Sequence, residues 1–122
     1  MRFDQVSVID HDGGPHGWRF DQGPENHDIV YNGHEQRIAR LGDTSNPRSW
    51  YGRSRAHVAT GISLTPPGIP KLFMEQEFLE DKQWSDNFEF HHNLMLHWAG
   101  LNAGDKQILD HVRFTRKLIK LR

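Results

Sequence analysis

The hydrophobic residues of this chain fall into short runs separated by turn-forming residues. An alternating stretch within residues 2–12 and a second stretch, residues 18–23, each predict a short strand. The apolar run Ile69–Met74 follows a Pro-Gly turn and predicts a buried strand, broken by Lys71. The pattern therefore predicts three strands, two of them near the start of the chain.

Between and after these strands, two segments have the spacing of helices. A polar side chain followed by Pro47 predicts a helix start, because proline lacks only an N–H that a first turn leaves unpaired. This helix is expected over residues 47–64 and ends before Pro66. The face expected to be buried comprises Trp50, Ser54, Val58, Gly61 and Ile62.

The second predicted helix covers residues 105–122, with Asp105 as its cap. Lysine and arginine side chains within residues 113–122 suit the negative end of its dipole. Its expected apolar stripe comprises Ile108, Val112, Thr115 and Ile119.

The remaining segments are predicted to be loops. Residues 32–46 are rich in glycine and small polar residues, and Arg37 and Arg40 within them are interpreted as solvated charges. Residues 76–104 form a loop whose length is typical of functional segments. Its aromatic residues are Phe78, Trp84, Phe88, Phe90 and Trp98. Since strands alternate with helices, the pattern favours an α/β fold of parallel βα units.

Composition narrows the class of protein. The 122 residues suffice for one domain, and 15 lysines and arginines nearly balance 16 acidic residues. Such a balance argues against a nucleic-acid or membrane partner. The chain has no cysteine, which excludes disulfides and thiolate metal sites. No signal peptide or membrane-spanning segment is recognisable, so a cytoplasmic protein is expected.

One motif carries candidate chemistry. Glu25-Asn26-His27-Asp28 follows a predicted strand and sets an imidazole beside a carboxylate at the mouth of a pocket. The alternative interpretation is that His-Asp dipeptides are common and often cap turns.

Taken with the later segments 46–51, 67–78 and 76–84, this motif resembles the α-amylase superfamily (glycoside hydrolase family thirteen). The closer resemblance is to bacterial 1,4-α-glucan branching enzymes. It implies a partial TIM (β/α)8 barrel of about two βα units, strands seven and eight with their helices. Residues 19–122 would be the C-terminal part of that barrel, and residues 1–18 an N-terminal extension of unclear role.

The resemblance also implies roles for particular residues. Asp28 matches the third catalytic carboxylate of the family, which bonds the reacting sugar, and His27 matches an imidazole that binds the same sugar. Asn26 would bind substrate, Trp84 would stack on a glucose ring or merely cover the mouth, and Glu77 would line the pocket or pair with Lys82. The expected chemistry is transfer of α-1,4-glucan segments to a 6-hydroxyl, without a cofactor or metal.

The nucleophile and acid/base carboxylates of the family have no match here, so the isolated chain is expected to be inactive. Expected partners are an α-glucan and the rest of the barrel, or a second copy of the chain. A hydrolase or a trehalose-forming relative is an alternative. A non-catalytic metal binder is another, because the chain has nine histidines. Its candidate ligands are Asp10, His11, Asp12 and His16, or His91, His92 and His97.

Four residues, at three places in the chain, depart from the family pattern. Glu75 stands where the family usually has glycine, a residue that tolerates unusual backbone dihedrals. Lys71 replaces an apolar residue, and Gly23-Pro24 replaces an apolar pair in the strand before the motif. We therefore expect local irregularity at both predicted strands.

Overall fold

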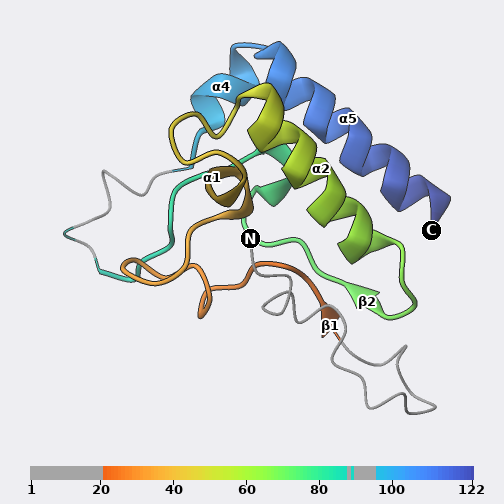
Figure 1. The fold of residues 1–122 in the computed structure, drawn as a ribbon, viewed down its shortest axis with the longest axis horizontal. Coiled ribbons are helices and arrows are strands. Elements are labelled where there is room, and N and C mark those ends of the chain that lie inside the picture. The colour runs from red at the N-terminus through yellow and green to blue at the C-terminus, as the bar shows by residue number, and fades with distance from the viewer. Residues whose placement is uncertain (1–20, 88, 90–95) are drawn as a thin grey trace.

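The computed structural model describes residues 21–87, 89 and 96–122 of the chain (Figure 1). The expected strand within 2–12, the extension 1–18, and the side chains of Phe88 and Phe90 lie outside these residues. The elements run in the order β1 (Asp21–Gln22), α1 (Ile38–Gly42), α2 (Trp50–Leu64), β2 (Ile69–Pro70), a 3-10 helix η4 (Gln76–Phe78), α4 (Trp98–Asn102) and α5 (Lys106–Leu121).

The two strands pair in parallel, with Asp21 opposite Ile69 and Gln22 opposite Pro70. Parallel pairing requires a crossover, and α1 and α2 lie in the connection between the strands. The strand expected over Ile69–Met74 is wrong in length, because β2 ends at Pro70. Proline has no N–H for a ladder, so it is poorly suited to continue this strand.

Helix α2 begins later than predicted, at Trp50. Ser49 is its N-cap, and its Oγ accepts a hydrogen bond from Gly52 N at 3.1 Å. The same hydroxyl donates to Asp43 Oδ2 at 2.6 Å. Hydrogen bonds from Ser49 and Ser45 lower the pKa of Asp43 to about 2. Since α2 begins only at Trp50, Pro47 lies in the turn that leads into the helix.

The prediction of which face of α2 is buried is also wrong. Trp50 is 66% exposed and Val58 is 56% exposed. Apart from Leu64, the buried residues of α2 are instead small: Gly52, Ala56, Ala59, Thr60 and Ser63. Small side chains let α1 approach closely, and a Cβ built on Gly42 would lie 2.9 Å from Gly52 Cα. Which face of α2 is buried therefore depends on side-chain size as well as on hydrophobicity.

Helix α1 was not predicted, because residues 32–46 were expected to be a loop. Its Ile38 and Ala39 form a hydrophobic core with two alanines of α2 and with Leu79 from the segment after η4. Within its described residues, the predicted loop 76–104 likewise contains the short helices η4 and α4. Local packing therefore orders part of both segments.

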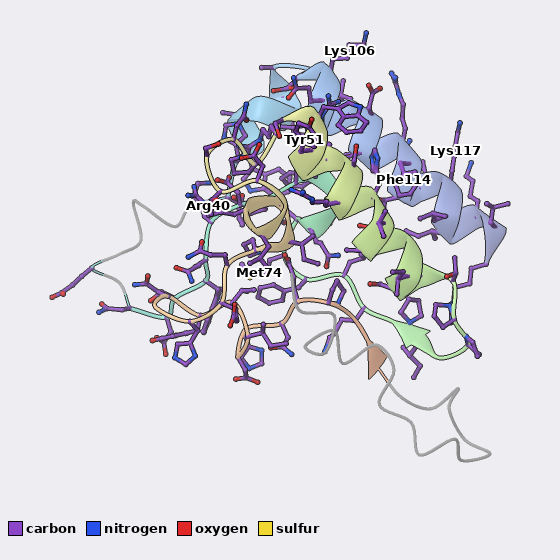
Figure 2. The ribbon with its side chains drawn as sticks, in the orientation of Figure 1. Arg40, Tyr51, Met74, Lys106, Phe114 and Lys117 are labelled. Atoms are coloured by element: carbon purple, nitrogen blue, oxygen red, sulfur yellow. The ribbon has the colours of Figure 1, made fainter. Side chains whose placement is uncertain are left out.

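The C-terminal helix agrees well with prediction. Asp105 caps α5, since its Oδ1 accepts from Gln107 N at 2.9 Å. Ile108 and Thr115 are buried as expected, but Ile119 is 52% exposed and His111 is buried in addition. Helices α2 and α5 lie side by side (Figure 1). Phe114 projects from α5 (Figure 2). Its ring lies 4.3 Å from that of His57 of α2.

Glu75, where the resemblance expects glycine, has a left-handed backbone with φ 57° and ψ 25°. This conformation costs a residue with a side chain about 1–2 kcal/mol, and glycine much less. Burial raises the pKa of Glu75, and the charges of Glu77 and Glu80 raise it further. Its buried Oε2 has no hydrogen-bond partner within the described residues.

Replacing Glu75 by glycine is accordingly expected to increase the free energy of unfolding by about 1 kcal/mol, as measured by urea denaturation. Leu79→Gly is the matched control, because Leu79 also has positive φ (64°) but is only 1% exposed. Loss of its core packing should lower stability by about 2–5 kcal/mol. If Glu75→Gly does not increase the free energy of unfolding, the left-handed backbone at Glu75 is not a source of strain.

Candidate functional site

The turn that carries the candidate chemistry follows β1 and is organised by Asn26. Asn26 Oδ1 accepts hydrogen bonds from Asp28 N at 2.9 Å and Ile29 N at 2.8 Å. Asn26 O accepts from Val30 N at 3.1 Å. An asparagine side chain that bonds the backbone two residues ahead is a recognised turn former. The oxygen of Asn26 is therefore used within the turn.

His27 and Asp28 extend from this turn towards solvent. His27 Nε2 lies 3.3 Å from Asp28 Oδ1, and the two side chains are 62% and 82% exposed. The expectation of a paired imidazole and carboxylate therefore agrees with the geometry. Both groups are free to meet a ligand from solution.

Trp84 is brought to the same place by backbone pairing. Tyr31 and Trp84 form an isolated parallel bridge. Trp84 N donates to Val30 O at 2.9 Å, and Asn32 N donates to Trp84 O at 2.7 Å. The Trp84 ring then lies 5.8 Å from the His27 ring, with 74° between their planes. The loop after β2 thus places an aromatic ring beside the turn after β1.

Tyr31 also packs against Trp84, although nothing in the sequence pattern assigned it to the site. Its ring lies 5.5 Å from that of Trp84 and 5.7 Å from that of His34. Its hydroxyl donates to Asp86 Oδ1 at 2.8 Å, and this hydrogen bond raises the pKa of Tyr31. The apolar residues between Asp28 and Tyr31 were the available signal, since they indicate an extended segment. We call His27, Tyr31, His34 and Trp84 the aromatic cluster.

Glu77 lies in η4, where its charge acts on Glu75. The expected pairing of Glu77 with Lys82 is wrong, because Lys82 Nζ lies 3.1 Å from Glu80 Oε1. Burial acts to raise the pKa of Glu80, but N–H donors from His97 and Lys82 outweigh it and the pKa is lowered. The contacts that join His27 to Trp84 do not involve Glu77.

The interpretation of Arg37 as a solvated charge is wrong. Its side chain is 1% exposed, and its Nε donates to Glu25 Oε2 at 2.8 Å. Glu25 Oε1 accepts from Ile38 N at 2.5 Å. Burial raises the pKa of Glu25, while the Arg37 charge opposes that rise. The candidate turn is thus preceded in the chain by a residue of a buried ion pair, Glu25.

Arg40 is not simply solvated either. Arg40 and Arg48 lie 3.0 and 3.1 Å from the two carboxylate oxygens of Asp81. Burial opposes ionisation of Asp81, yet the two guanidinium groups lower its pKa overall. Basic residues from the segment around α1 therefore hold the acidic segment after η4. The Trp98 ring of α4 lies 5.4 Å from that of Phe78, and Trp98 is 48% exposed.

The metal-binding alternative receives no ligand set from the described residues. Within them, no group of three or more histidine and acidic side chains could hold a metal ion. The candidate ligands Asp10, His11, Asp12 and His16 lie outside the described residues, as do His91 and His92. Over the same described residues, no helix is both long enough and apolar enough to cross a membrane.

Chemically, the described arrangement places the exposed Asp28 carboxylate beside the His27 imidazole, and that imidazole beside the Trp84 indole. A carboxylate and an imidazole can bond two hydroxyls of one ligand, and aromatic rings provide an apolar surface beside them. Comparison with known proteins found no matching family model, no matching curated protein and no matching solved structure.

Proposed function

We propose that this chain is the C-terminal part of the catalytic barrel of a glucan-active enzyme of the α-amylase superfamily. The observation that carries the proposal is the meeting of His27, Asp28 and Trp84 beyond the carboxyl ends of β1 and β2. In parallel barrels, active sites form from the loops at that end of the strands. The order of parallel strand, helix, parallel strand and helix also fits strands seven and eight.

In this proposal Asp28 bonds hydroxyls of the sugar at the reacting position. A fixed negative charge there favours a transition state with oxocarbenium character over the ground state. His27 bonds the same sugar, and the Trp84 indole packs against a ring face. Asn26 shapes the turn, and Glu77 of η4 would line the sugar site of the complete barrel.

The parent activity that fits the resemblance best is 1,4-α-glucan branching. The enzyme would transfer an α-1,4-glucan segment to a 6-hydroxyl through a covalent glycosyl intermediate. The nucleophile and the acid/base group would come from other strands of the barrel. We therefore expect the chain to bind α-glucan but to be inactive unless the rest of the barrel, or another chain, completes the site.

The proposal predicts measurable binding of maltoheptaose by isothermal titration calorimetry. Asp28→Ala should weaken binding at least about tenfold, because a hydrogen bond to a charged group contributes about 1.5–3 kcal/mol. Trp84→Ala should weaken it comparably through the loss of ring contact.

Asp110→Ala is the matched control, since Asp110 is a partly exposed carboxylate that pairs with Arg113 on α5. It removes the same charge away from the turn and should leave the affinity unchanged. Equal affinity of the Asp28→Ala and wild-type chains for maltoheptaose would overturn the assignment of Asp28.

A further inference from the structure

A single buried guanidinium connects the two loops that form the candidate site. Besides its ion pair with Glu25, Arg37 donates from one terminal nitrogen to Met74 O at 2.8 Å and to Phe73 O at 3.1 Å. Its other terminal nitrogen donates to Lys82 O at 3.4 Å. Each of these partners lies close in sequence to a part of the site.

The partners of Arg37 lie close in sequence to the two segments that form the candidate site. Glu25 immediately precedes Asn26 and the turn that carries His27. Phe73 and Met74 belong to the segment that leaves β2, and Lys82 lies two residues before Trp84. One planar group therefore fixes the distance between the turn after β1 and both ends of the loop after β2.

The location of Arg37 makes this connection rigid. The guanidinium is almost inaccessible to water and lies 5.3 Å from the centre of the Phe73 ring. Arginine presents donors in a fixed planar fork, so the bonded segments cannot rotate independently about it. A lysine carries three donors on one nitrogen and cannot reach the carboxylate and the carbonyl groups in the same geometry.

We propose that Arg37 is a positioning residue, which holds the turn at His27 and the loop at Trp84 in the geometry that brings their rings together. Arg37 itself does not touch a ligand in this proposal. Its consequence for sugar binding rests on the proposed function, but its effect on the ring contact does not.

The test uses Arg37→Lys, which keeps the charge but not the fork, and Glu25→Asp, which keeps the carboxylate but shortens its reach. The probe is the NMR signal of the His27 ring protons, identified by its loss in His27→Gln. In the wild-type chain the Trp84 ring current shifts this signal, and Trp84→Ala defines its value without the indole. Spectra are recorded with trimethylamine N-oxide, an osmolyte that favours the folded state.

Arg37→Lys and Glu25→Asp should move the His27 signal most of the way to its position in Trp84→Ala, while circular dichroism still shows the helices. Maltoheptaose affinity should fall about tenfold in both variants, the effect of misaligning roughly one hydrogen bond. Arg113→Lys, which alters an exposed pair on α5, should change neither quantity.

The two proposals fail in different ways. A wild-type His27 signal in either folded variant overturns the role of Arg37, whatever the chain binds. If the signal moves as expected but the wild-type chain does not bind maltoheptaose, the positioning role stands and the proposed function fails. If both variants are unfolded even with the osmolyte, Arg37 is a folding residue and the positioning proposal is rejected.

Discussion

Arg37→Met is expected to lower the free energy of unfolding by about 3–5 kcal/mol, because removal of one partner leaves a buried charge uncompensated. The Glu25 side chain is 2% exposed, and the guanidinium of Arg37 is its ion-pair partner. The carbonyls of Phe73 and Met74 would lose a donor as well. Since a domain of this size is stable by only about 5–15 kcal/mol, the variant should be partly unfolded at modest urea concentrations.

Urea unfolding followed by circular dichroism measures this effect. Arg113→Met is the matched control, because its pair with Asp110 is exposed and should contribute less than about 1 kcal/mol. The double variant Glu25→Gln/Arg37→Met removes both charges and should be more stable than Arg37→Met alone. If Arg37→Met and Arg113→Met unfold at the same urea concentration, the buried pair does not support the fold.

Features that depend on nearby residues could be predicted from the sequence. Asp105 caps α5 as expected, and α2 occupies most of its predicted range, although it begins later and buries a different face. The imidazole and carboxylate of His27 and Asp28 meet because they are adjacent in the chain. Such signals are local, and a single sequence contains all of them.

Features that depend on distant partners could not be predicted in this way. Helix α1 has only five residues, too few for a periodic pattern, and it determines which face of α2 is buried. Arg37 has the appearance of a loop charge until Glu25 and the carbonyls after β2 surround it. The bridge between Tyr31 and Trp84 likewise joins residues that no spacing rule relates.

Acidification provides a second large effect, through His111 of α5. Its ring is 1% exposed and stacks on His57 of α2 at 4.8 Å, with 10° between the planes. Neither ring nitrogen of His111 has a hydrogen-bond partner within the described chain. Burial, together with a smaller effect of nearby His57, lowers the pKa of His111 to about 3. Protonation would place an unpaired charge between the two helices.

Carboxylates near His111 do not reverse this shift. Glu25 and Glu80 line the same small cavity, but Arg37 and Lys82 already pair with them. Burial and the charge of Arg53 also lower the pKa of His57, against a smaller opposing effect of Asp110. The interface between α2 and α5 is therefore built for neutral imidazoles.

The sign of the pH dependence follows from the lowered pKa. Below pH 6.5, the ordinary value for histidine, the unfolded chain binds a proton at His111 and the folded chain does not until about pH 3. Stability contributed by neutral His111 is therefore complete above pH 6.5 and declines as the pH falls. Between pH 6.5 and 5 the expected loss is about 2 kcal/mol.

Urea unfolding at pH 7 and pH 5 tests this expectation in the wild-type chain and in His111→Leu. Leucine has a similar volume but no titratable group, so the variant should lose most of the difference between the two pH values. His34→Gln is the control, because His34 is exposed and its replacement should leave the difference unchanged. An undiminished acid sensitivity in His111→Leu would show that other groups, and not the buried imidazole, destabilise the chain at low pH.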